Sequence, residues 1–269
     1  MRGNRRPSKT GNLGIHMKII KTIEEWKNIR LSIKNPIGFI PSMGCLHEGH
    51  ASLLKKSKEE NETTVLSIFI NPIQFNDKSD FIHYPKTEKE DLDLARSLEV
   101  DFVFIPSAEE IYADQYNFKM TSTHPLSQIM EGKSRPGHFD GMLTVVLKLL
   151  QLVKPQRAYF GEKDFQQLHL VKAMVKSFFI DTEIISCPTI RLKERLPLSS
   201  RNKRLSTEDM EKAKKFSEIF HHASSVEEIK ENFQREGIEF DYVESHDEHF
   251  FTAVRISGVR LIDHRDMLK

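Results

Sequence analysis

Two histidines three residues apart are the residues whose types and spacing most clearly suggest chemistry in this sequence. They lie in the segment 41–50, which reads Pro-Ser-Met-Gly-Cys-Leu-His-Glu-Gly-His. If a helix begins here, His47 and His50 share one of its faces. Gly44 permits a tight turn ahead of them, and Gly49 permits the helix to begin close to a ligand. Unpaired N–H groups at a helix start favour phosphate, so the segment is a candidate phosphate site.

Three interpretations of this histidine pair remain open at this point. The histidines can be ordinary polar side chains that are satisfied at the start of a helix. They can form a metal site, although the zinc-protease pattern places its histidines four apart and no third ligand is evident. They can also donate hydrogen bonds to the phosphates of a nucleotide. The glycine-rich turn after a strand favours the nucleotide, because ligands of parallel sheets bind beyond the carboxyl ends of the strands.

The elements that must position these residues alternate between strand and helix. Short apolar or β-branched runs predict strands at 36–41, 63–71, 101–106, 157–161 and 181–189. Helical patterns predict helices at 49–60, 87–98, 141–153 and 164–179. In the second of these helices, Thr87 and Glu90 have the spacing of a capping box. Such alternation is typical of an α/β fold, and we expect a Rossmann-like, doubly wound parallel sheet.

The pattern changes after Thr189. The stretch 193–201 is charged and loop-like, and charged surface helices are predicted at 206–222 and 225–235. The segments 239–245 and 251–263 alternate apolar and polar residues, as in an antiparallel pair. We therefore predict a second, smaller α+β domain at the C-terminus. The predicted divisions of the chain are an extension at 1–16, a larger domain at 17–189 and the small domain at 190–269.

Composition limits the function classes. The 269 residues are 38% hydrophobic and 29% charged, and the net charge of +1 gives no reason to expect nucleic-acid or membrane partners. No run approaches the roughly 18 apolar residues of a membrane span. Two cysteines without metal-type spacing fit a reducing cytoplasm. Residues 1–16 hold four basic residues and no acid. We favour a leader ahead of a start at Met17, although a targeting peptide or a cloning remnant would have the same composition.

Further segments, in order along the chain, resemble the pantoate–β-alanine ligase family of the nucleotidylyltransferase superfamily, as does the histidine segment itself. They are 67–75 (SIFINPIQF), 84–85 (YP) with 91–92 (DL), 135–141 (RPGHFDG), 159–167 (YFGEKDFQQ), 187–191 (CPTIR) and 199–202 (SSRN). The resemblance runs from about Met17 to the C-terminus. A lone His-x-x-His would carry little weight, but a collinear series of matches is specific.

The resemblance implies an enzyme that condenses pantoate with β-alanine while ATP is split to AMP and diphosphate through an acyl adenylate. Mg²⁺ would accompany the ATP rather than occupy a protein cage. Family members are typically homodimers, so a homodimer is implied. The implied ATP-binding residues are Met43, Gly44, Cys45, Leu46, His47, Glu48, Gly49, His50, Gly161, Glu162, Lys163, Asp164, Ile190, Leu198, Ser199, Ser200 and Arg201.

Roles within the site follow from the same resemblance. The catalytic candidates, which would hold and neutralise the triphosphate, are His50, His47, Lys163, Ser199, Ser200 and Arg201. We interpret His50, the proton donor of the family, as a hydrogen-bond donor to phosphate. The substrate-binding candidates are Gln74 and Gln167 for pantoate, and Asn71, Tyr84 and Arg135 for β-alanine or loop contacts. The segments 76–84 and 193–198 are candidate lids that keep water from the adenylate.

The sequence departs from the family pattern in three places, one of which is a shortened segment between Tyr242 and Ala253 in the small domain. Cys45 stands where a small residue is usual. The loop that usually reads Asp-Gly-Leu-Ala-Met-Ser-Ser-Arg is Glu-Arg-Leu-Pro-Leu-Ser-Ser-Arg at 194–201. Arg195 replaces a flexible glycine, and Pro197 fixes a backbone angle and removes an N–H donor. We therefore expect the geometry or rate of loop closure over ATP to differ from the family pattern.

Alternative functions share the first motif. One is a nucleotidyltransferase that adenylates another small substrate and stops there. A second is a metal-dependent hydrolase built on the two histidines, and a third is a nucleotide-binding regulatory protein that has lost catalysis through the altered loop. Gln74, Gln167 and the segment 135–141 favour the ligase over the nucleotidyltransferase.

Overall fold

The computed structural model describes residues 17–267, apart from the side chain of Lys78, so the predicted extension at 1–16 lies outside the described residues. Six strands form one parallel sheet in the order β1-β4-β3-β2-β5-β6. The strands are β1 (Lys18–Ile20), β2 (Ile37–Ser42), β3 (Thr63–Ile68), β4 (Phe102–Phe104), β5 (Arg157–Gly161) and β6 (Glu183–Cys187). The predicted α/β class with a doubly wound parallel sheet is confirmed.

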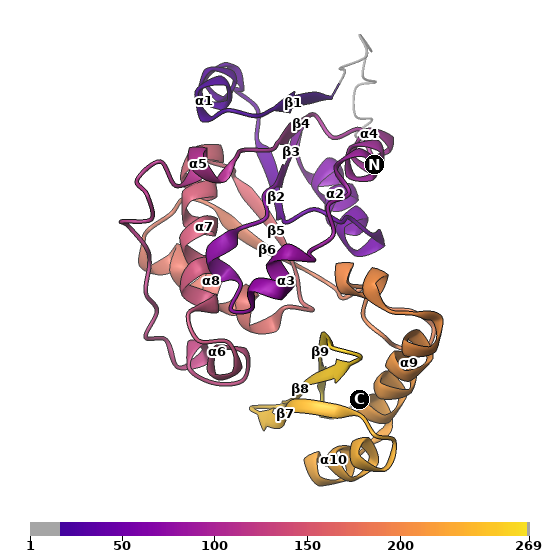
Figure 1. The fold of residues 1–269 in the computed structure, drawn as a ribbon. Coiled ribbons are helices and arrows are strands. Elements are labelled where there is room, and N and C mark those ends of the chain that lie inside the picture. Colours follow the sequence, from indigo (N-terminus) through magenta and orange to yellow (C-terminus); the bar gives the residue numbers. More distant parts are fainter. Residues whose placement is uncertain (1–16, 268–269) are drawn as a thin grey trace, which may run out of the picture.

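Helices cover both faces of this sheet (Figure 1). The long helices are α1 (Ile23–Ser32), α2 (Glu48–Glu60), α4 (Glu88–Ser97), α7 (His138–Val153) and α8 (Phe165–Ser177). Helices α1, α7 and α8 bury apolar residues in one core, and α2 and α4 bury theirs in another. Shorter helical turns are η1 (Pro72–Gln74), α3 (Lys78–Ile82), α5 (Ala108–Ile111), η2 (Pro125–Ser127) and α6 (Glu131–Ser134). No helix of the described chain is long and apolar enough to cross a bilayer.

The strand order reverses direction between β2 and β5. From β2 the chain continues outward to β3 and β4, whereas β5 and β6 lie on the other side of β2. Connections from the carboxyl ends of β2 and β5 therefore diverge, and such a switch point is where ligands of open α/β sheets bind.

A three-stranded antiparallel sheet with two helices follows the large sheet (Figure 1). Its elements are η3 (Ser200–Arg204), α9 (Thr207–His222), α10 (Val226–Arg235), β7 (Glu239–His246), β8 (His249–Ile256) and β9 (Val259–Asp266). The prediction that 251–263 is one member of an antiparallel pair is wrong. Ser257 (φ +47°) and Gly258 (φ +78°) form a two-residue turn between β8 and β9, because positive φ at both positions suits a tight hairpin. The boundary at 189/190 stays a prediction.

Other predicted boundaries need correction. The strand expected over 63–71 ends at Ile68, because Pro72, which lacks an N–H, begins a 3₁₀ turn. Helix α7 begins three residues earlier than predicted, after Gly137 with φ +80°. The capping box at Thr87 is absent, since its hydroxyl donates to Oδ1 of Asp91 at 3.2 Å and makes no cap hydrogen bond.

Candidate active site

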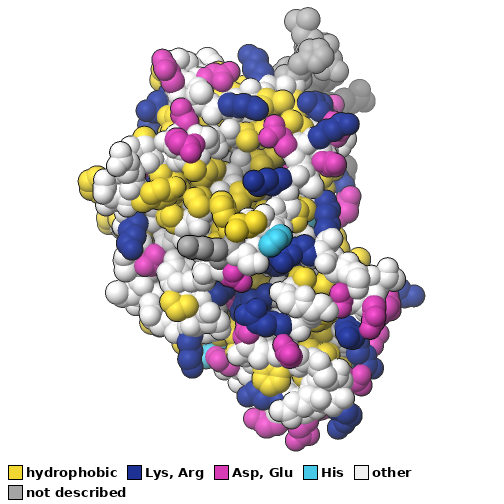
Figure 2. Space-filling view, in the orientation of Figure 1, with side chains coloured by type: hydrophobic (Ala, Val, Ile, Leu, Met, Phe, Trp, Pro, Cys, Tyr) yellow, Lys and Arg dark blue, Asp and Glu magenta, His cyan; other side chains and the backbone are white. Residues whose placement is uncertain are grey.

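A cavity of about 1410 Å³, its open mouth included, lies at the switch point. Its wall combines the turn after β2, the end of β5, the start of α8 and the η3 turn. The predicted site residues on this wall are Met43, His47, Gly49, His50, Gln74, Tyr84, Arg135, Gly161, Lys163, Asp164, Gln167, Ile190, Leu198, Ser199, Ser200 and Arg201. Those off the wall are Gly44, Cys45, Leu46, Glu48, Glu162 and Asn71. In Figure 2, basic side chains gather on the surface where the larger and smaller parts of the molecule meet.

The buried carboxylate of Asp91 holds the turn after β2. Oδ2 accepts the backbone N–H of Cys45 at 2.8 Å, and Oδ1 accepts that of Leu46 at 2.7 Å. Gly44 has φ +82°, and a Cβ there would lie 2.9 Å from Asp91 Oδ2, so the position requires glycine. Cys45 is fully buried. Gly44, Cys45 and Asp91 therefore shape the turn without lining the cavity. No role was predicted for Asp91 from the sequence, although the segment 91–92 was part of the family resemblance.

Hydrogen bonds at the start of α2 fix the tautomers of both histidines. Nδ1 of His47 accepts the N–H of Gly49 at 3.1 Å, and Nδ1 of His50 accepts the N–H of His47 at 3.3 Å. A neutral imidazole that accepts at Nδ1 carries its proton on Nε2. Both rings therefore offer an Nε2–H donor to a ligand. Gly49 makes room for this arrangement, because a Cβ there would lie 2.7 Å from the ring of His47. Capping the helix and binding phosphate are thus compatible roles.

Both histidines are neutral near pH 7. Burial, followed by the charge of Lys163, lowers the pKa of His47 from 6.5 to about 4. Burial, followed by the neighbouring His47, lowers the pKa of His50 to about 3. The pair therefore adds hydrogen-bond donors to the cavity without adding positive charge.

Positive charge comes instead from the end of β5. Lys163 follows Gly161 by two residues, and its Nζ lies 3.2 Å from Oδ1 of Asp164. Burial alone would raise the pKa of Asp164, but the charge and hydrogen bond of Lys163 hold that pKa below its usual value. Glu162 lies off the wall, where its carbonyl accepts a hydrogen bond from Nε2 of His264 at 2.7 Å. This contact joins the end of β5 to β9.

The η3 turn brings the serines and arginine of the last motif to the cavity. Ser199 caps the turn, and its Oγ accepts the N–H of Arg201 at 3.3 Å. Ser200 Oγ lies 3.1 Å from the hydroxyl of Tyr84. Arg201 Nη2 donates to Oδ2 of Asp80 at 2.9 Å. The candidate lid at 76–84 therefore contacts the η3 turn directly.

The atypical loop before η3 is a tight hairpin. Leu198 donates its N–H to the carbonyl of Ile190 at 2.9 Å, and Leu192 donates to the carbonyl of Leu196 at 2.8 Å. Leu196 is buried in the core of the C-terminal sheet. Arg195 has φ +65°, a conformation that suits glycine. Altered loop closure over ATP stays a prediction.

The two glutamines and Asn71 differ in their placement. Gln74 Oε1 accepts from Asn71 Nδ2 at 2.9 Å, and Gln74 Nε2 lies 3.1 Å from Met43 Sδ. Asn71 is fully buried and also accepts a hydrogen bond from the hydroxyl of Tyr112 at 2.6 Å. Asn71 therefore lies behind Gln74 and orients it. Gln167 reaches the wall from α8, and its side chain makes no hydrogen bond within the described chain.

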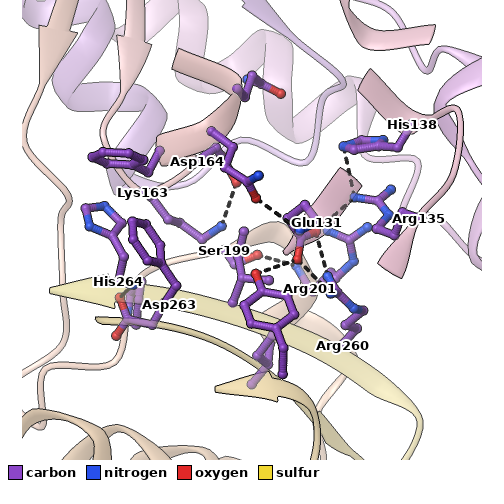
Figure 3. Close-up of a pocket in the computed structure, with 18 of the residues that line it drawn as sticks. Glu131, Arg135, His138, Lys163, Asp164, Ser199, Arg201, Arg260, Asp263 and His264 are labelled. Carbon is purple, nitrogen blue, oxygen red and sulfur yellow. Dashed lines mark hydrogen bonds and ion pairs between the residues drawn. The ribbon is translucent and has the colours of Figure 1, made fainter. Parts of the chain in front are cut away.

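A second cavity of about 770 Å³, its open mouth included, adjoins the first, between the large sheet and the C-terminal sheet (Figure 3). The residues that line both cavities are Arg135, His138, Lys163, Asp164, Gln167, Ser199 and Arg201. Glu131 also lines the second cavity and accepts from both terminal nitrogens of Arg260, at 2.6 and 2.7 Å. Glu131, His138 and Arg260 were not among the site residues predicted from the sequence. Only His138 carried a signal, since it lies within the matched segment 135–141.

Comparisons with known proteins agree with this geometry. The family model described as pantoate-beta-alanine ligase matches residues 17–265. Pantothenate synthetase of Coxiella burnetii is 51% identical over 247 residues, which cover 91% of this chain and 95% of that protein. Pantothenate synthetase of Legionella pneumophila is 49% identical over 249 residues, covering 92% of this chain and 98% of that protein.

Solved structures extend the likeness to the fold. The pantoate-beta-alanine ligase of Francisella tularensis, complexed with beta-gamma ATP and beta-alanine, has a TM-score of 0.92 and 45% identity, covering 94% of this chain and 99% of that one. Pantothenate synthetase of Thermus thermophilus has a TM-score of 0.87 and 33% identity, covering 94% and 100%. With sequence, fold and site in agreement, the chain belongs to the pantoate–beta-alanine ligase family.

Proposed function

We propose that this ligase joins the carboxylate of pantoate to the amine of β-alanine by way of a pantoyl adenylate, with release of diphosphate and then AMP. One observation carries the proposal. The neutral Nε2–H donors of His47 and His50 share a cavity with the cation of Lys163 and with the uncharged amides of Gln74 and Gln167. Hydrogen-bond donors suited to phosphate and two amides suited to a carboxylate thus line the same cavity.

In the first step, a carboxylate oxygen of pantoate attacks the α-phosphorus of ATP. The bond from that phosphorus to the diphosphate breaks, and negative charge develops on the leaving oxygen. Lys163 and the donors of His47 and His50 are suited to stabilise that charge. Gln74 and Gln167 can bind the pantoate hydroxyls and carboxylate without a cation that would weaken the nucleophile. Catalysis of this kind rests mainly on positioning and charge neutralisation.

In the second step, the amine of β-alanine attacks the carbonyl carbon of the adenylate. The bond from that carbon to the AMP oxygen breaks, and the amine nitrogen loses a proton. β-Alanine carries a carboxylate at its other end, and Arg135 is the proposed partner of this group. The contacts between the segment 76–84 and η3 would keep water from the adenylate.

The metal and the assembly belong to the same proposal. Mg²⁺ enters as part of the ATP substrate, held by phosphate oxygens and water. The enzyme works as a homodimer in the cytoplasm, where ATP is available. Light scattering of the purified chain measures its mass directly.

The reaction is tested by supplying purified protein with ATP, Mg²⁺ and pantoate, with and without β-alanine, and following AMP. We expect AMP release to depend on β-alanine, and labelled diphosphate to exchange into ATP only when pantoate is present. AMP release that ignores β-alanine would overturn the ligase. Exchange with pantoate but no condensation would instead favour a nucleotidyltransferase that stops at an adenylated product.

A further inference from the structure

His138 occupies a position between two substrate subsites. It is the first residue of α7, is only 8% exposed, and lines both cavities. Its Nδ1 lies 2.8 Å from the carbonyl oxygen of Gln74, and its Nε2 lies 3.0 Å from Nη1 of Arg135 (Figure 3). The ring of His138 therefore contacts Gln74, which is proposed to bind pantoate, and Arg135, which is proposed to bind β-alanine.

The partners of His138 determine its protonation. The carbonyl of Gln74 only accepts, so Nδ1 must carry a proton. The guanidinium of Arg135 only donates, so Nε2 must present a lone pair. Only the neutral Nδ1–H tautomer satisfies both contacts. Burial, followed by the charge of Arg135, lowers the pKa of His138 to about 3, which agrees with this tautomer.

Arg135 is held in place but is only weakly neutralised. Its Nη1 lies 3.4 Å from Glu131, whose carboxylate is engaged more closely by Arg260 and by the hydroxyl of Tyr242 at 2.8 Å. Its Nη2 donates to the carbonyl of Gln74 at 3.3 Å. These contacts and the bond to His138 use three of the five N–H donors of Arg135. A buried cation with donors to spare, beside a cavity, suits a carboxylate ligand.

We infer that His138 is a positioning residue that fixes the guanidinium of Arg135 relative to Gln74, and so sets the separation of the β-amino acid carboxylate from the bound hydroxy acid. The inference rests on the proposed function. It makes His138 a determinant of amine-substrate specificity, because a change in that separation would move the amine relative to the acyl carbon. A misplacement of this kind weakens attack even where both ligands still bind.

Two substitutions separate the two contacts of the ring. His138→Asn can place an amide N–H where Nδ1 lies, which keeps the bond to Gln74 and loses the bond to Arg135. We expect the KM for β-alanine to rise about tenfold or more, as for loss of a hydrogen bond to a charged group, with a smaller change in the KM for pantoate. His138→Gln can place an amide oxygen near Nε2, and we expect the KM for pantoate to rise more than the KM for β-alanine.

A matched control is His169→Asn. His169 is a half-buried histidine whose Nδ1 also pairs with a backbone carbonyl, that of Phe165 at 2.9 Å, but it lines neither cavity. Its substitution should leave both KM values unchanged, and thermal unfolding should show that all variants are folded. Equal effects of His138→Asn and His138→Gln on both KM values, or no effect, would overturn the inference. A wild-type chain with no pantoate-dependent exchange would instead refute the proposed function.

Discussion

The carboxylate of Asp80 lies 2.9 Å from Nη2 of Arg201 and 2.7 Å from Nη1 of Arg204. Asp80 belongs to the segment 76–84, whereas both arginines belong to the η3 turn, part of which lines the cavity at the switch point. Asp80 therefore pairs with two arginines of η3, in addition to the contact between Tyr84 and Ser200. Arg201 keeps further N–H donors for phosphate, because an arginine has five and Asp80 takes one.

Asp80→Asn should loosen this lid. A neutral amide loses the ion pairs with both arginines, and water then reaches the acyl adenylate more often. We expect the rate of pantoate-dependent AMP release without β-alanine, divided by the rate of condensation with β-alanine, to be several-fold higher in the variant than in the wild type. Asp77→Asn is the matched control, because it makes the same change in the same segment and asparagine still caps α3. Equal uncoupled release in the two variants would show that Asp80 does not hold the lid.

His50→Ala and Lys163→Ala should each slow pantoate-dependent diphosphate exchange by on the order of 10²–10³, as for loss of one preorganised donor to a developing charge. Lys172→Ala is the control, because Lys172 belongs to α8 but lines neither cavity, is exposed and donates to Ser186. A loss below about tenfold would mean that the substituted residue is not a central phosphate contact.

The two site histidines should remain neutral well below the usual histidine range. Because burial lowers the pKa of His47 to about 4 and of His50 to about 3, both rings gain their second proton only as the pH falls below about 5. Histidine NMR resonances of the free enzyme, assigned with the single alanine variants, should show no titration of these rings between pH 8 and pH 5. A midpoint near 6.5 for either ring would contradict the arrangement at the start of α2.

Local patterns predicted the parts of the site that local forces build. The apolar run of β2 and the glycine turn after it predicted a phosphate site around His47, whereas Lys163 was predicted from the family resemblance. The carboxylate that holds the β2 turn, Asp91, is 45 residues from Leu46 along the chain. Hydrophobic periodicity and capping patterns report only residues that are close in sequence, so they do not indicate a contact across 45 residues. For the same reason the Asp80–Arg201 pair could not be inferred from spacing.

Glu131→Gln should destabilise the fold in a pH-dependent way. Burial would raise the pKa of Glu131, but hydrogen bonds and charge from Arg260 lower it from 4.5 to about 2. A lowered folded-state pKa gives stability that is present above pH 4.5 and is lost as the pH falls toward 2. We expect a deficit on the order of 3 kcal/mol at pH 7 that shrinks at pH 3.5, measured by urea unfolding. A deficit independent of pH would mean that the charge of Glu131 contributes nothing.

Arg195→Gly tests whether the atypical loop carries a cost in backbone conformation. Arg195 has φ +65°, a conformation that destabilises the folded state by roughly 1–2 kcal/mol when the residue has a Cβ. Glycine removes this strain, but its greater freedom in the unfolded chain lowers the stability by roughly 0.5–1 kcal/mol. We expect the free energy of unfolding to rise by about 0.5–1 kcal/mol. The KM for ATP should change less than about twofold, because Arg195 lines neither cavity. Arg195→Ala is the control, since alanine removes the side chain but keeps the Cβ. If alanine stabilises the chain as much as glycine does, the cost lies in the arginine side chain and not in the backbone.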